Sequence, residues 1–238
     1  MIQFYAPDIE TCPILPESDS QHCVRVLRMK EGDIIEVIDG KGYRYECKLI
    51  DAHPKKAHIE IINKKNIPLS WSNNITIAIA PTKHLDRMEW VVEKMTEIGV
   101  NSIIPIHCRY SERKEIKVER LEKIAISAMK QSLKAVLPQI EPMTSIKEVI
   151  KNLDITQKFI AYCDSSTPRL LFSNEYKANK DTIILIGPEG DFAKDEIIYA
   201  LENGYKPISL GDNRLRTETA ALAACHTCHI INQINQKQ

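Results

Sequence analysis

Two glycine-containing segments near the C-terminus carry residue types from which an active site could be built. The first is Gly187-Pro188-Glu189-Gly190, which follows the apolar run 182–186. Glycine lets the backbone approach a ligand closely, and proline restricts the path of the chain. The Glu189 carboxylate could accept a proton during catalysis. A strand-to-helix turn whose carboxylate caps the next helix would explain the same four residues equally well.

The second segment, 210–220, combines two arginines with a carboxylate. Arg214 and Arg216 lie on either side of Leu215, and Glu218 follows at the beginning of a small-residue helix. Side chains two residues apart in an extended chain point to the same side, so we expect both guanidinium groups to face the same way. Surface arginines beside a carboxylate are often only a solvated ion pair. Their position between a turn and a helix start favours a binding site.

Residues 71–238 alternate between short apolar runs and helical spacing. This alternation predicts a largely parallel sheet with helices on both faces. Both glycine segments would then follow adjacent strands at the carboxyl edge of the sheet, where open α/β sheets bind ligands. The expected strands are 75–80, 102–106, 158–163, 182–186 and 207–210, and the expected helices are 86–98, 119–135, 194–203 and 217–231.

The first seventy residues have a different pattern. Alternating and β-branched runs predict strands at 33–39, 43–50 and 57–62, with a hairpin turn at 39–42. Several short strands in succession indicate a small barrel. The polar segment 64–74 is typical of a linker, which divides the chain into domains 1–70 and 71–238.

Composition excludes some classes of protein. Lysine plus arginine equals aspartate plus glutamate, with 32 of each, so the chain is not a globally basic nucleic-acid binder. No apolar run approaches the ~20 residues of a membrane span, and the N-terminus has no signal-peptide pattern, so we expect a cytoplasmic protein without membrane contact. The seven cysteines are irregularly spaced, which favours free thiols over a disulfide framework.

Three other interpretations compete with an active site in the glycine segments. Cys225-His226-Thr227-Cys228-His229 fits the C-x-x-C-H pattern of haem attachment or a zinc site, but helical spacing makes it a buried stripe instead, and we expect no metal. A Rossmann-type nucleotide-binding oxidoreductase would share the alternating pattern, yet G-x-G-x-x-G is missing. A non-catalytic RNA-binding protein would not need the two C-terminal segments.

The two segments, together with motifs in the same chain order, resemble the 16S ribosomal RNA (uracil-N3) methyltransferases of the SPOUT superfamily. Two differences from the family pattern stand out: Asp191 replaces a common glycine, and Lys134 stands where arginine is usual. The supporting motifs are His22–Asp33, Lys83 with Asp86–Trp90, Lys94–Val100, Arg109–Glu112 and Ala128–Ser132.

This resemblance implies a specific architecture and activity. A PUA-like β-barrel at 1–70 would bind RNA, and an α/β SPOUT domain at 71–238 would contain a C-terminal trefoil knot. The enzyme would use S-adenosyl-L-methionine to methylate N3 of a specific uridine in 16S ribosomal RNA of the small ribosomal subunit. Members of the superfamily usually form homodimers, so we expect one here.

The resemblance and the chemistry together select the candidate site residues. The catalytic candidates, which would engage the target base or take its N3 proton, are Arg216, Glu218 and Glu189. The cofactor-binding candidates are Ile186, Gly187, Pro188, Glu189, Gly190, Leu210, Gly211, Leu215, Thr219 and Ala220. The RNA-binding candidates, chosen for positive charge, are Arg25, Arg28, Lys30, Arg109 and Arg113.

Overall fold

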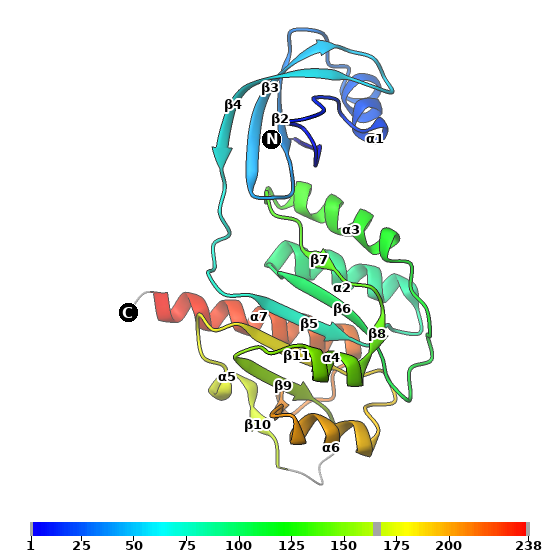
Figure 1. The fold of residues 1–238 in the computed structure, drawn as a ribbon, viewed down its shortest axis with the longest axis vertical. Coiled ribbons are helices and arrows are strands. Elements are labelled where there is room, and N and C mark those ends of the chain that lie inside the picture. The colour runs from blue at the N-terminus through cyan, green and yellow to red at the C-terminus, as the bar shows by residue number, and fades with distance from the viewer. Residues whose placement is uncertain (1, 164–167, 237–238) are drawn as a thin grey trace. The chain divides into compact units, whose positions relative to one another are not determined.

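The computed structural model describes residues 2–163 and 168–236 of the chain. The chain divides into two compact units (Figure 1). The first comprises Met1–Ser70 with Ile126–Leu137, and the second comprises Trp71–Ala125 with Pro138–Gln238. The segment 126–137 therefore packs with the N-terminal residues, an arrangement that helical periodicity alone cannot indicate. Among the described residues, no helix is long and apolar enough to cross a membrane.

A four-stranded sheet forms the framework of the first unit, in the order β1-β2-β3-β4. The elements are β1 (Gln3–Tyr5), α1 (Glu17–Gln21), the π-helical turn η1 (His22–Val26), β2 (Ile34–Ile38), β3 (Tyr43–Asp51) and β4 (His58–Asn66). β1 runs parallel to β2, and the other two pairs are antiparallel. Tyr45, Cys47 and Leu49 alternate into the buried core of this unit, as the sequence pattern predicted.

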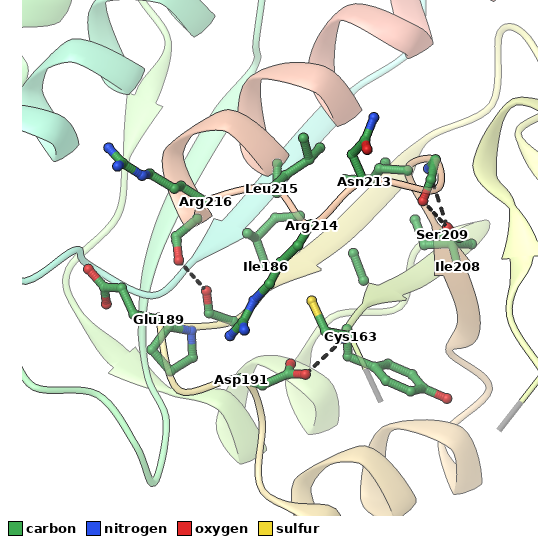
Figure 2. Close-up of a pocket in the computed structure, with 18 of the residues that line it drawn as sticks. Cys163, Ile186, Glu189, Asp191, Ile208, Ser209, Asn213, Arg214, Leu215 and Arg216 are labelled. Atoms are coloured by element: carbon green, nitrogen blue, oxygen red, sulfur yellow. Dashed lines mark hydrogen bonds between the residues drawn. The ribbon is translucent and has the colours of Figure 1, made fainter. Parts of the chain in front are cut away.

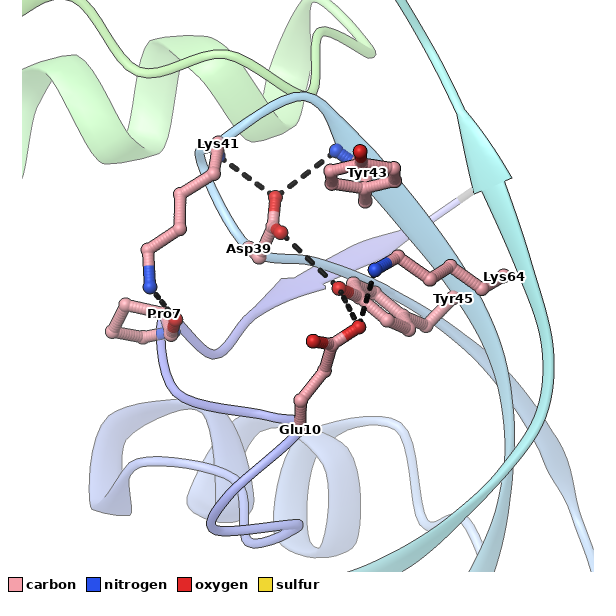
Figure 3. Close-up of polar contacts among 7 residues, drawn as sticks. All are labelled: Pro7, Glu10, Asp39, Lys41, Tyr43, Tyr45 and Lys64. Carbon is pink, nitrogen blue, oxygen red and sulfur yellow. Dashed lines mark hydrogen bonds and ion pairs between the residues drawn. The ribbon is translucent and has the colours of Figure 1, made fainter.

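A polar cluster closes the hairpin between β2 and β3 (Figure 3). The Asp39 carboxylate accepts hydrogen bonds from the backbone N–H groups of Lys41 and Tyr43, at 2.7 and 3.0 Å. The buried Tyr45 hydroxyl lies 3.1 Å from Glu10 and 3.2 Å from Asp39. Burial raises the pKa of the Tyr45 hydroxyl, and the nearby Glu10 and Asp39 carboxylates raise it further. The hydroxyl is therefore protonated at neutral pH and acts as a hydrogen-bond donor. The predicted hairpin turn is confirmed.

The second unit contains a parallel sheet in the order β10-β12-β9-β11-β5-β6-β7, with β8 paired to β6. Its strands are β5 (Ile75–Ile79), β6 (Ser102–His107), β7 (Gln139–Ile140), β8 (Thr144–Ser145), β9 (Gln157–Ala161), β10 (Leu170–Leu171), β11 (Thr182–Ile186) and β12 (Lys206–Ser209). Its helices are α2 (Leu85–Ile98), α4 (Ile146–Asn152), α5 (Phe172–Glu175), α6 (Lys194–Glu202) and α7 (Thr217–Gln236), and α3 (Val118–Gln131) begins here and ends in the first unit.

Helices cover both faces of this sheet. Apolar residues of α4 and α6 pack on one face, in a core that includes Ile160, Ile183 and Leu185. On the other face α7 contacts β5 and β11 and packs against α2. The central strands β5 and β11 are buried throughout, which is why they appear in the sequence as continuous apolar runs.

The structure corrects three expectations about element position. β4 continues to Asn66, so the first residues of the predicted linker belong to a strand. α3 ends at Gln131, where the prediction extended to 135. β9 lies between β11 and β12, so the strands before the two glycine segments are not adjacent. This order depends on pairing between distant segments, which local periodicity does not contain.

Candidate cofactor pocket

A pocket of about 360 Å³ lies at the carboxyl ends of β9, β11 and β12. Most of its wall comes from three segments: 161–163 at the end of β9, 186–191 at the end of β11 and 208–217 around the end of β12. Arg87, Arg169 and Ala220 complete the lining. Because β9 lies between the other two strands, its end contributes the middle of the wall (Figure 2). The two glycine segments are thus brought to one site, as expected, although they are one strand further apart.

Hydrogen bonds fix the segment that follows β11. The buried Thr217 hydroxyl donates to the Gly187 carbonyl oxygen at 3.0 Å, which ties this turn to the start of α7 (Figure 2). A Cβ atom on Gly187 would lie 3.1 Å from the Phe192 ring, so a side chain there would be crowded. The Lys83 backbone N–H donates to Glu189 at 3.0 Å and holds that carboxylate at the pocket wall. The first segment is therefore both a tight turn and part of the pocket wall.

The two arginines point in different directions. Arg214 and Arg216 both line the pocket and both are exposed. In Figure 2, Arg214 extends toward the turn that carries Asp191, whereas Arg216 extends away from it. The expectation that both guanidinium groups face the same way was wrong, because residues 211–216 bend and do not form a strand.

Glu218 is buried and lies outside the pocket lining. One carboxylate oxygen is 3.8 Å from Nε of Arg87, a residue of α2 that does line the pocket. The other oxygen is buried and has no hydrogen-bond partner among the described residues. Glu218 is therefore linked to the pocket through Arg87. The sequence alone did not indicate this pair, because Arg87 on α2 and Glu218 on α7 are far apart in the chain.

Most of the predicted cofactor-binding residues lie in the pocket wall. Gly190 and Thr219 do not: Gly190 faces Tyr110, and Thr219 is an exposed residue of α7. Those that line it are Ile186, Gly187, Pro188, Glu189, Leu210, Gly211, Leu215 and Ala220. Lining residues that the sequence analysis missed include Arg87, Cys163, Arg169, Asp191, Ser209 and Asn213. Two of them had a signal in the sequence: Asp191 departs from the family pattern, and Arg87 lies within the motif Asp86–Trp90.

The predicted RNA-binding residues are divided between the two units. Arg25, Arg28 and Lys30 are exposed in the first unit, in and just after η1. In the second unit, the Arg109 guanidinium pairs with Asp195 at 2.7 Å. The Arg113 guanidinium donates to the backbone carbonyls of Thr82 and Lys83, at 3.3 and 2.9 Å.

The C-x-x-C-H segment is part of the packing between α7 and the end of α2. Cys225 and Cys228 are buried, and burial raises the pKa of Cys225 to about 12. The Cys225 thiol donates to the Gly99 carbonyl oxygen at 3.2 Å, and His229 Nε2 lies 2.6 Å from the same oxygen. No cluster of three metal-ligating side chains occurs in the described part of the chain.

A parallel sheet with a pocket at its carboxyl edge defines an α/β protein of the class that binds a nucleotide-like cofactor. The family model for an RNA methyltransferase domain matches residues 70–229, and that for an RNA methyltransferase PUA domain matches residues 15–62. The chain therefore belongs to the RNA methyltransferase family.

Curated relatives and solved structures agree with this assignment. The chain is 30% identical over 223 residues to a ribosomal RNA small subunit methyltransferase E of Buchnera aphidicola, covering 91% of this chain and 87% of the relative. It is 28% identical to the Bacillus subtilis enzyme of that name, covering 94% and 92%.

Among solved structures, a probable rRNA methyltransferase from Porphyromonas gingivalis is 44% identical, with a TM-score of 0.94 over 99% of this chain and 100% of that one. A ribosomal RNA small subunit methyltransferase E from Neisseria gonorrhoeae bound to S-adenosyl methionine is 27% identical, with a TM-score of 0.85 over 97% and 98%.

Proposed function

We propose that this protein transfers a methyl group from S-adenosyl-L-methionine to N3 of a specific uridine in 16S ribosomal RNA of the small subunit. The observation that carries the proposal is the pocket at the carboxyl ends of β9, β11 and β12. Its position at the carboxyl edge of a parallel sheet suits a nucleoside cofactor. The names of the curated relatives and the ligand of the N. gonorrhoeae structure support the reaction class.

The residues of the pocket fit this cofactor chemically. Ile186, Ile208 and Leu215 offer an apolar wall for a flat base, since side chains of this kind line most ligand sites. Backbone groups of the turn 187–191 and of residues 209–211 offer hydrogen-bond donors and acceptors to ribose hydroxyls and to the amino acid portion. Crowding at Gly187 explains why a side chain is not accommodated in this turn.

Bound S-adenosyl-L-methionine supplies an activated methyl group, so the protein mainly aligns the reactants and manages charge. Alignment can contribute about 7–11 kcal/mol, and proton transfer about 10²–10⁴-fold in rate. We assign Arg216 to a phosphate of the RNA next to the target nucleotide, and Glu189, in the cofactor pocket wall, to the N3 proton of the target base. Glu218 would act through Arg87, whose side chain it faces.

Further parts of the proposal concern the whole protein. We assign RNA binding to the first unit, through the exposed cations of residues 25–30 and their attraction to phosphate. We also propose that the second unit has the SPOUT topology with a C-terminal trefoil knot, and that the enzyme acts as a homodimer in the cytoplasm. The similarity to the 16S ribosomal RNA (uracil-N3) methyltransferases supports these points.

Calorimetric titration tests the cofactor part of the proposal. The purified protein is titrated with S-adenosyl-L-methionine and, separately, with NAD. We expect saturable binding of the first ligand and no binding of the second. Binding of NAD alone would instead support the oxidoreductase interpretation.

A further inference from the structure

Methyl transfer to a base requires that a second binding site adjoins the cofactor pocket. Reacting atoms must approach to about 3–3.5 Å, so the two sites must share part of their walls. A second cavity of about 570 Å³ meets this condition. Cys163, Arg169, Asp191, Gly211, Asn213 and Arg214 line both cavities. Three other surface pockets, centred near Lys114, Glu60 and Lys177, share no lining residue with the cofactor pocket.

The outer wall of the second cavity has an exposed aromatic side chain, Tyr110, with 52% of its surface accessible. It contacts the glycine turn closely, since a Cβ on Gly190 would lie 3.1 Å from the Tyr110 Cβ. This contact explains the glycine at 190, which does not line the cofactor pocket.

The segment that carries Tyr110 is held at both sides. The Arg109 backbone N–H donates to Glu196 at 2.8 Å, and its guanidinium pairs with Asp195 at 2.7 Å, which anchors the segment to α6. On the other side, the Cys108 backbone N–H donates to the Ser111 hydroxyl at 3.0 Å. The backbone on either side of Tyr110 is thus anchored within the second unit.

Positively charged side chains line the same cavity as Tyr110. Lys194, Arg214 and Arg169 line the second cavity, and the first two are exposed. Neither Lys194 nor Arg214 makes an ion pair with any residue in the described ranges. Asp191, a carboxylate in the same wall, accepts hydrogen bonds from the backbone N–H groups of Cys163 and Phe192 at 2.8 and 2.9 Å. A second carboxylate, Asp212, also lines the cavity, so its three cations face two carboxylates and the balance of charge is positive. An aromatic surface combined with positive charge is what binds single-stranded nucleotides.

We propose that this second cavity binds the target uridine nucleotide, with its base stacked on Tyr110 and its phosphate near Lys194 and Arg214. The proposal rests on the methyltransferase function proposed above and identifies where the substrate would lie. Arg214, which lines both cavities, would contact the nucleotide beside the cofactor. Binding here also requires an unpaired target base, because Tyr110 occupies the position of a neighbouring base in a stack.

Substitution of Tyr110 tests this site. We expect Tyr110→Ala to lower kcat/KM for 16S ribosomal RNA about tenfold, from the usual contribution of one base–aromatic contact. Tyr110→Phe keeps the aromatic surface and should stay within about twofold of the wild type. Ile198→Ala, at an exposed apolar residue of α6 outside the cavity, is the matched control. Calorimetric affinity for S-adenosyl-L-methionine should be unchanged in all three variants, which also confirms folding.

Lys194→Gln provides a second measurement. It should raise KM for RNA and weaken the dependence of KM on salt, whereas Lys151→Gln, on α4 and outside the cavity, should not. Wild-type kcat/KM in Tyr110→Ala, or equal losses in Tyr110→Phe and Tyr110→Ala, would overturn the stacking role. If the wild-type protein binds S-adenosyl-L-methionine but methylates no RNA, the proposed function fails and this inference fails with it.

Discussion

Arg216 differs from Arg214 in its relation to the two cavities. Arg214 lines both of them, whereas Arg216 lines only the cofactor pocket among these two and extends away from the turn that carries Asp191. It is exposed and makes no ion pair with another described residue, so its guanidinium is available to an oxygen or a phosphate. Arginine suits such a ligand because its planar fork donates two parallel hydrogen bonds.

We predict that Arg216→Ala lowers methylation by at least about tenfold, the equivalent of one charge-assisted hydrogen bond of about 1.5–3 kcal/mol. The free energy of unfolding should change little because the side chain is exposed. Methyl transfer to 16S ribosomal RNA and chemical denaturation measure the two quantities. Wild-type methylation by the folded variant would refute the assignment.

Arg87 and Glu218 form a pair that joins α2 to the start of α7. Replacing Arg87 by methionine leaves a buried carboxylate without its cation, and we expect the free energy of unfolding to fall by about 1–3 kcal/mol. Adding Glu218→Gln removes the buried charge and should recover part of that loss. Denaturant unfolding of both single variants and of the double variant measures the coupling free energy between Arg87 and Glu218. Additive losses would show that the two side chains do not interact.

At the scale of elements, Gly99 shows how a single residue can control packing. It ends α2 with φ of 132°, and a Cβ there would lie 2.5 Å from the Trp71 ring. Its carbonyl oxygen also meets Cys225 and His229 of α7. The predicted helix 86–98 stops just before Gly99, but only the structure shows that this position is crowded.

We predict that Gly99→Ala lowers the free energy of unfolding by more than about 2 kcal/mol, because backbone strain adds to the clash with Trp71. Gly204→Ala is the matched control. Gly204 also has a positive φ, of 83°, but a Cβ there would have no atom within 4 Å, so its loss should be confined to backbone strain of about 1–2 kcal/mol. Equal losses in the two variants would show that the contact with Trp71 is unimportant.

Sequence periodicity located the long elements of the second unit. β5, β11, α2, α6 and α7 begin within one residue of their predicted positions, because buried strands and amphipathic helices have strong patterns. Short elements such as β7, β8, β10 and α5 have two to four residues and no periodic pattern, so they were missed. α4 was also missed, although Ser145 and Glu148 form a capping box that could have identified its start.

The residues of the candidate site were predictable where they follow elements with a clear apolar pattern. They were not predictable where they come from elements whose place depends on the order of strands in the sheet. Both glycine segments follow strong apolar runs, so their residues were found from local sequence. Arg87 reaches the pocket from α2, Cys163 from the end of β9 and Arg169 from the residue before β10, and their contribution depends on how these elements are placed in the sheet. No local pattern states that β9 lies between β11 and β12. Residues from such neighbours can be assigned only once the sheet is known.

At the scale of the whole molecule, we assign binding of the RNA beyond the target nucleotide to the first unit, and binding of the target nucleotide together with methyl transfer to the second. We predict that replacing Arg25 and Arg28 together by alanine weakens binding to 16S ribosomal RNA, more strongly at low salt, because phosphate contacts release counterions. Affinity for S-adenosyl-L-methionine should stay unchanged. Filter binding at several salt concentrations and calorimetry measure the two effects. A loss confined to cofactor affinity would contradict this division of roles.

The central claim is that this chain methylates N3 of one uridine in 16S ribosomal RNA. The most direct measurement incubates the purified protein and S-adenosyl-L-methionine with small subunits from cells that lack the activity, then maps modified nucleosides by mass spectrometry of RNA fragments. We predict one 3-methyluridine, formed at a single position and only with the cofactor present. A methyl group on another atom or base, or 16S ribosomal RNA that remains unmodified by protein that binds the cofactor, would contradict the account.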